Sequence, residues 1–216
     1  MLSTVFAAWE LQPDIDWAAL APEVVVAAGA LLLILFDSVF LERARPYMTM
    51  LAGATLIGAT IPLLYLAEDG PDRVLFGGAY VVDNFALVLK ALFLLSGYVV
   101  VLLSTNYIAE GDYWENEYYS LLMSSLLGML VMSSARDLVT MFVALELLSI
   151  PAYLLATWRK RDLKSNEAGL KYYLMGVFAS AVMLYGMSLL FGVSGTTSLA
   201  GIRDGPAGGP PGRYHM

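Results

Sequence analysis

Long apolar stretches alternate with short polar segments along the chain. Six stretches are long enough to cross the roughly 30 Å hydrocarbon core of a bilayer, which needs about 20 mostly apolar residues per helix. They are residues 22–40, 47–67, 84–108, 118–134, 138–158 and 168–193. Lipid offers no water to backbone groups, and the runs are continuous rather than alternating, so we expect helices and not strands. The pattern predicts an all-α, polytopic bundle of about six transmembrane helices.

The polar segments between these stretches indicate orientation and domain limits. With the N-terminus outside, the inner loops hold more Lys and Arg than the outer ones, including the run Arg159-Lys160-Arg161. Because basic residues are retained inside, we expect the N-terminus outside. Residues 1–202 are expected to form one transmembrane domain. Residues 203–216, rich in Gly and Pro, are predicted to be disordered.

Composition agrees with a membrane protein and excludes several functions. The 216 residues are 59% hydrophobic and 14% charged, against about 25% charged in soluble domains. Such hydrophobicity also excludes disorder, and a net charge of −7 argues against nucleic-acid binding. The chain has no Cys and a single His, His215. Any iron–sulfur cluster or other redox cofactor is therefore expected on another chain.

Glu146 is the strongest candidate for chemistry. It lies near the middle of the fifth stretch, roughly 12–18 Å from either end at 1.5 Å per residue. A carboxylate at that depth is costly, so such a residue is a functional hypothesis by default. A group whose charged form is disfavoured can load and release a proton as its surroundings change. The alternative is a structural carboxyl kept neutral by a neighbouring helix.

Three further groups accompany this glutamate. Pro151 lacks an N–H and so frees the carbonyl of Leu147, and Ser149 lies in the same break. An ordinary proline kink is the alternative. Lys171 follows Glu167 at the spacing of a helical ion pair, and it is equally compatible with a proton relay and with an interfacial anchor.

Lys90 is a weaker candidate. It lies six residues after Asn84, at the start of the third stretch. From there its side chain is expected to extend to the outer membrane surface.

Two segments resemble a known family. Residues 135–156, which contain Leu145-Glu146 and Ser149-Ile150-Pro151, resemble the glutamate-bearing helix of antiporter-like subunits of respiratory complex I. Residues 166–186, with Lys171-Tyr172-Tyr173, resemble the helix that follows it. Sister subunits usually carry Trp directly before this glutamate. Leu145 at that position favours subunit N of proton-translocating NADH:quinone oxidoreductase.

The resemblance implies a role in proton translocation coupled to electron transfer from NADH to quinone. It matches Glu146 to the buried glutamate of the family and Lys171 to a lysine of its polar axis. It also implies that NADH, FMN, iron–sulfur clusters and quinone bind other subunits. The partners would be further membrane-arm subunits and lipid, in the bacterial inner membrane. Rival interpretations are a subunit of a multi-subunit cation/proton antiporter and a truncated, non-transporting scaffold.

The resemblance also implies a longer protein. Subunit N of the family has about fourteen helices in two inverted repeats, and a broken helix with another lysine is expected after Ile202. A Gly- and Pro-rich tail follows instead. We therefore expect a fragment, a frameshifted product or one part of a split subunit, without a complete proton half-channel of its own.

Overall fold

The computed structural model describes residues 15–40, 45–70, 72–109, 115–159 and 162–205. Its long helices are α2 (Ala21–Phe40), α3 (Arg45–Asp69), α4 (Asn84–Ala109), α5 (Glu115–Ser134), α6 (Leu138–Ala156) and α7 (Leu163–Ser194). Each of the six expected stretches coincides with one of them, and the all-α prediction is confirmed for the body of the fold.

Five of these helices are long and apolar enough to cross a membrane. The described part of α5 is not among the five; it begins with Glu115 and carries serines along its length. The chain is thus a polytopic helical membrane protein. Helix packing does not test the expected orientation of the N-terminus, which stays a prediction.

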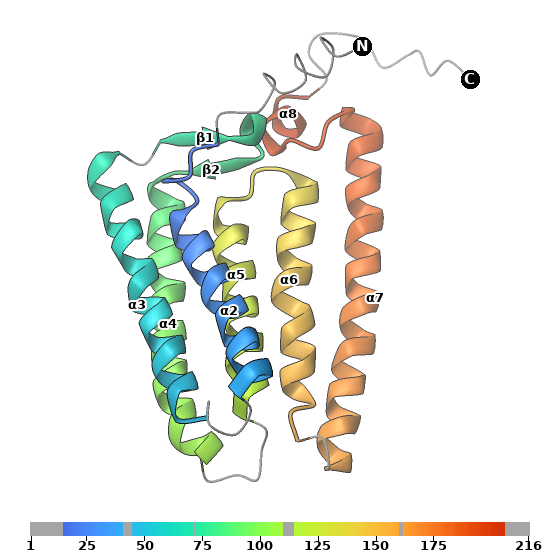
Figure 1. Ribbon diagram of the computed structural model, residues 1–216. Helices are drawn as coiled ribbons and strands as arrows, with labels where there is room; N and C mark the ends of the chain where they lie inside the picture. The colour runs from blue at the N-terminus through green and yellow to red at the C-terminus, as the bar shows by residue number, and fades with distance from the viewer. Residues whose placement is uncertain (1–14, 41–44, 71, 110–114, 160–161, 206–216) are drawn as a thin grey trace, which may run out of the picture.

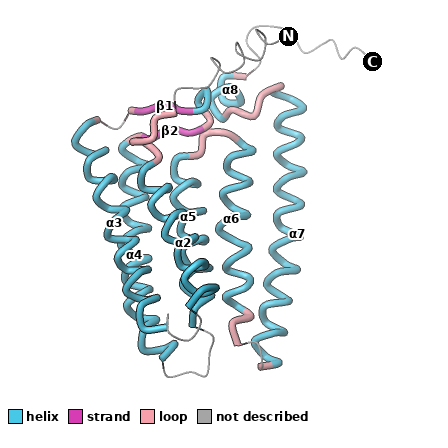
Figure 2. Tube along the Cα trace, in the orientation of Figure 1, coloured by secondary structure: helices cyan, strands magenta, loops and turns pink. Residues whose placement is uncertain are grey.

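The long helices lie side by side, with α7 at one edge (Figure 1). Helix α2 packs on α3 and α5, α4 packs on α3 and α5, α6 packs on α5, and α7 packs on α6. Two short elements absent from the sequence prediction, β1 (Arg73–Leu75) and β2 (Tyr80–Val82), form an antiparallel hairpin across one end (Figure 2). We call this end, where α2, α4 and α6 begin, the hairpin end.

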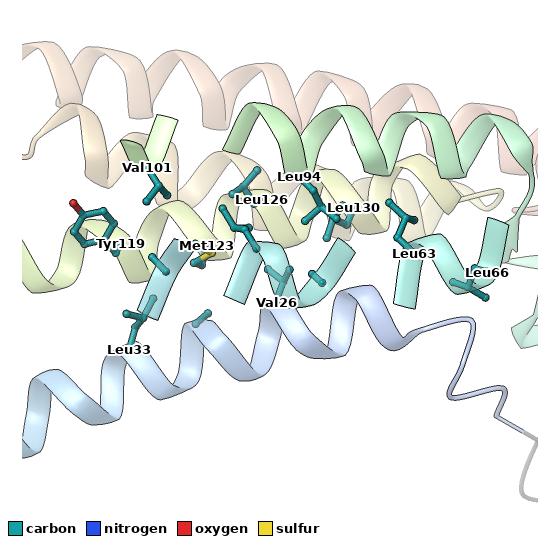
Figure 3. Close-up of a cluster of buried hydrophobic side chains, with 14 of the residues drawn as sticks. Val26, Leu33, Leu63, Leu66, Leu94, Val101, Tyr119, Met123, Leu126 and Leu130 are labelled. Carbon is teal, nitrogen blue, oxygen red and sulfur yellow. The ribbon is translucent and has the colours of Figure 1, made fainter. Parts of the chain in front are cut away.

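The hydrophobic core lies among α2, α3, α4 and α5. Val26, Leu33, Leu94, Met123 and Leu130 are among its buried side chains (Figure 3). In contrast, the buried residues of α7 reduce to Gly169. The core therefore belongs to one side of the bundle, and among the long helices α7 packs on α6.

Backbone hydrogen bonds join the connections at the hairpin end. Ala135 pairs with Tyr80 of β2, and Asp137 pairs with Ser198 in the segment after α7. Arg136 N–H donates to the Ala79 carbonyl at 2.9 Å. The α5–α6 turn is therefore held between the hairpin and the end of α7.

The last helix, α8 (Leu199–Asp204), extends two residues into the segment predicted to be disordered. The prediction placed the boundary too early because the Gly- and Pro-rich composition begins only at Gly205, where φ is 72° and the helix ends. Residues 206–216 lie outside the described residues.

Candidate functional site

Glu146 lies midway along α6, eight residues after its first residue, Leu138, and ten before its last, Ala156. The side chain is partly buried. Its Oε1 is buried and has no hydrogen-bond partner among the described residues. A buried polar atom without a partner loses its hydration and gains nothing in return. Oε1 of this carboxyl is therefore free to accept a hydrogen bond from a group outside the described residues.

Pro151 and Ser149 follow on the same helix. Pro151 is buried within α6, which continues through it to Ala156. The polar contact in this break is made by the Leu148 carbonyl, to which the Ser125 hydroxyl of α5 donates at 3.0 Å. The expected freeing of the Leu147 carbonyl by Pro151 stays a prediction, because α6 continues through this position and the side-chain hydrogen bond is made to the Leu148 carbonyl.

Gly128 sets the close approach of α5 to α6 around Glu146. A Cβ atom at this position would lie 2.5 Å from the Leu148 nitrogen and 2.9 Å from the Ala144 oxygen. Backbone atoms cannot move aside as a flexible side chain can, so only glycine fits. These contacts bracket Glu146 in the sequence and fix its helix against α5.

The same two helices and the residues that follow α6 line an open pocket of about 370 Å³ at the end opposite the hairpin. Its lining includes Glu117, Ser120, Thr157 and Trp158. The Trp158 Nε1 atom is buried without a partner among the described residues. Polar groups of this kind suit water molecules.

Lys171 is exposed on α7, with 72% of its side chain accessible, and its Nζ pairs with Glu167 Oε1 at 2.5 Å. The ion pair expected from the sequence is confirmed. Because α7 begins at Leu163, where Asp162 caps it by accepting from Lys164 N–H at 2.9 Å, Lys171 lies about 12 Å along the helix. The apolar stretch beginning at residue 168 placed it too close to the helix end. No recorded contact links it to Glu146.

The expectation that Lys90 reaches the membrane surface is wrong. Its side chain is fully buried, and its Nζ lies 2.8 Å from Oε1 of Glu23 on α2. The Lys90 ammonium also donates to the Tyr80 hydroxyl at 3.0 Å. Hairpin residues and α2 cover the position from which an isolated helix would have allowed the side chain to extend.

Glu23 is the residue that sequence reasoning missed. It stands in the first turn of α2, where a glutamate is usually exposed and favours the positive end of the helix dipole. Its side chain is only 6% exposed. The pairing with Lys90 depends on how α2 and α4 pack, and no local sequence pattern predicts it.

Two partly exposed ion-pair groups stabilise the hairpin end. Asp83 pairs with Arg136 at 2.6 Å. Burial raises the pKa of Asp83, but the Ala86 N–H and the Arg136 guanidinium outweigh it, so the net pKa is lowered. The hydrogen bond from Arg73, at 2.6 Å, lowers the pKa of Asp16. Both carboxylates are therefore ionised and serve as structural ties.

Comparisons of sequence place these features in a family. Residues 135–207 match the transmembrane family described as NADH:quinone oxidoreductase/Mrp antiporter. A subunit N of NADH-quinone oxidoreductase from Erythrobacter litoralis is 39% identical over 190 residues, which are 87% of this chain and 39% of the relative. An NAD(P)H-quinone oxidoreductase subunit 2 from Microcystis aeruginosa is 37% identical, over 89% of this chain and 37% of the relative.

Two solved structures of membrane complexes contain chains that are similar to this one. A chain of respiratory complex I from Thermus thermophilus, determined with bound aureothin, superimposes with a TM-score of 0.68 at 31% identity, covering 90% of this chain and 40% of that one. A chain of the archaeal membrane-bound sulfane sulfur reductase superimposes with a TM-score of 0.71 over 86% and 39% of the two chains. Its identity of 21% shows a shared fold only.

The helical bundle and the intramembrane glutamate in the family-matched segment are the features expected of an antiporter-like membrane subunit. More particularly, most of the chain is similar in sequence to subunit N of NADH-quinone oxidoreductases. It spans about two fifths of the length of the relatives that it matches. The predicted resemblance to subunit N is thereby confirmed, and the bacterial relatives agree with the predicted multi-pass inner-membrane protein.

Proposed function

We propose that this chain forms part of the membrane arm of an NADH:quinone oxidoreductase and takes part in proton translocation. Electron transfer from NADH to quinone, with FMN and iron–sulfur clusters, would take place on other subunits. The relatives named as NADH-quinone oxidoreductase subunit N support this assignment. The membrane-arm subunits and the lipid bilayer would be its partners.

The observation that carries the proposal is the buried, unpartnered Oε1 of Glu146. In a poorly solvated place the protonated carboxyl is favoured, and an approaching positive charge favours ionisation. A change in the position of a nearby cation can therefore move a proton on and off this group. The pocket between α5 and α6 supplies polar lining on the same pair of helices.

Lys171 is the cation that the family resemblance suggests. Counted from the end opposite the hairpin, it lies about 12 Å along α7, and Glu146 lies about 15 Å along α6. The two groups are thus at similar depths but on different helices. Lys171 would act as a tuning charge through water or through parts of the assembly that pack against α7.

The test is a comparison of three variants in the assembled complex. Glu146→Gln keeps size and polarity but cannot carry the proton, Glu146→Asp keeps the carboxyl, and Asp204→Asn changes an exposed charge. NADH oxidation and proton uptake are measured in membrane vesicles. We expect most proton pumping to be lost in Glu146→Gln, partly kept in Glu146→Asp and unchanged in Asp204→Asn. Normal pumping by Glu146→Gln would overturn the role of Glu146.

A cation/proton antiporter is the second candidate function, because the description of the matching family includes Mrp antiporters. The same vesicles distinguish the two functions. Exchange of sodium for protons without NADH, lost in Glu146→Gln, would favour the antiporter.

A further inference from the structure

The buried ion pair of Glu23 and Lys90 lies on helices that the proposed proton site does not use. Glu23 is in the first turn of α2, and Lys90 lies about 9 Å along α4. Tyr80 from the hairpin and Ser134 at the end of α5 are buried nearby, and the Tyr80 pKa is affected by both Glu23 and Ser134. Four elements therefore bring polar groups to one enclosed place, which we call the Glu23–Lys90 cluster.

A purely structural reason for this cluster is weak. Burying both members of an ion pair costs solvation that the attraction between them often fails to recover, and apolar residues of similar volume usually pack as stably. Buried polar networks that serve stability alone are fully hydrogen-bonded. Neither carboxylate oxygen of Glu23 has a hydrogen bond of regular geometry among the described residues, and neither does the Ser134 hydroxyl. The cluster thus has unused capacity to bind a proton or water.

The two charged groups are unequally supported. Besides Glu23, the Lys90 ammonium has the Tyr80 hydroxyl at 3.0 Å and the face of the Tyr80 ring at 5.1 Å from its centroid. Both contacts favour a cation. The recorded charged partner of the Glu23 carboxylate is Lys90. The ammonium therefore has more polar contacts within the cluster than the carboxylate has.

Tyr80 remains a neutral phenol. Burial raises its pKa well above the ordinary value, and the Glu23 carboxylate raises it further. The phenol oxygen accepts from Lys90, so its own proton is available to the carboxylate. Tyr80 can therefore hold the ammonium while Glu23 changes its protonation state.

We propose that the Glu23–Lys90 cluster is a second proton-binding site of this protein, separate from Glu146, with Glu23 as the group that exchanges the proton. A proton from water at the hairpin end forms an O–H bond with a Glu23 carboxylate oxygen. The cluster then changes from neutral to a single positive charge, which stays on Lys90 against Tyr80. Release returns the proton to water and restores the ion pair.

Several other charged groups at the hairpin end form ion pairs of their own. Asp83 pairs with Arg136, and Arg73 joins Asp16 and Asp69, all partly exposed. These groups lie on the segments before α2, after α3, before α4 and after α5. They define the local electrostatic surroundings of the cluster.

Infrared difference spectroscopy of the assembled complex tests the site. A change of pH that protonates Glu23 adds a carboxylic C=O band, which deuterium exchange shifts. We expect Glu23→Gln to remove one such band that Glu146→Gln and the control Asp16→Asn leave in place. A spectrum of Glu23→Gln identical to that of the unmodified protein would overturn the proposal.

Two additions keep the test decisive. If Glu23→Gln fails to accumulate, the double variant Glu23→Gln/Lys90→Met removes both charges together and is examined for the same band. The band does not depend on pumping, so the proposal and the assignment of Glu146 can fail separately. We also expect Glu23→Gln to lower the number of protons moved per NADH while NADH oxidation continues.

Discussion

Two regions of the molecule differ in how their charged side chains are paired. The first consists of helices α2, α3, α4 and α5, and the second consists of α6 and α7. In the first group, Glu23 and Lys90 are enclosed and face each other at 2.8 Å. In the second, Glu146 has a buried oxygen without a partner, and Lys171 is exposed and paired on its own helix. Both regions hold a carboxyl inside a membrane helix, but only one supplies its counter-charge within the described chain.

The two regions also differ in how much apolar surface they bury. Helices α2, α3, α4 and α5 bury a continuous apolar core, whereas α7 exposes most of its length. An outward-facing apolar surface is normal in lipid, so exposure alone identifies no partner. The comparison teaches that the carboxyl with a counter-charge lies beside the continuous core, and that the carboxyl without one among the described residues lies on α6, which packs on the exposed helix α7.

Removing Lys90 should have the largest effect on stability. Lys90→Met leaves the Glu23 carboxyl buried without its counter-charge, and losing one member of a buried pair costs about 3–5 kcal/mol. We expect a large fall in the thermal unfolding temperature in detergent. Adding Glu23→Gln to Lys90→Met should recover much of the loss. An unchanged unfolding temperature in Lys90→Met would contradict the enclosed pair.

Widening the α5–α6 contact should have a smaller effect. In Gly128→Ala the new methyl group meets the backbone of Leu148 and Ala144, and overpacking of this kind costs about 1–3 kcal/mol. Gly186→Ala on α7 is the matched control because a Cβ there meets nothing within 4 Å. Thermal unfolding of both variants measures the difference. Equal stability would show that α5 and α6 can separate freely at Gly128.

Breaking the exposed pair on α7 should matter less again. Lys171→Ala removes the contact with Glu167, and exposed helical pairs contribute about 0.3–0.5 kcal/mol. We expect an unfolding temperature close to that of the unmodified protein in low and high salt alike. A loss as large as that of Lys90→Met would mean that Lys171 is buried in the assembled complex.

The hydrophobic pattern predicted the helices well because the bilayer imposes one requirement on every span. It did less well where a polar turn extends a helix, as at Leu163–Glu167, since the capping by Asp162 adds residues that hydropathy does not detect. The hairpin was missed because its two strands are three residues each and join an otherwise irregular connection.

The candidate site was predictable in part for the same physical reason. Glu146 stood out because its depth follows from counting residues along one helix. The partner of Lys90 did not, because α2 and α4 are separated by α3 in the sequence and meet only through tertiary packing. The side chain of a lysine near a helix end can either extend to the surface or be enclosed. For Lys90, the packing of the hairpin and of α2 against it determines that the side chain is enclosed.

A similarly small effect on stability is expected at the glutamate that carries the proposed function. Glu146→Gln replaces a carboxyl whose Oε1 has no partner among the described residues by an amide of the same shape, so that atom loses no hydrogen bond to them. We expect a change below about 1 kcal/mol, the net value of a single hydrogen bond. Thermal unfolding in detergent, measured beside Glu23→Gln, checks this. A large loss in Glu146→Gln would mean that Glu146 has a stabilising partner in the assembled complex. Unchanged stability of Glu146→Gln together with lost pumping would show that Glu146 acts in proton transfer and not in packing. The same distinction is harder to make for Glu23 and Lys90, because a substitution in that buried pair also changes stability.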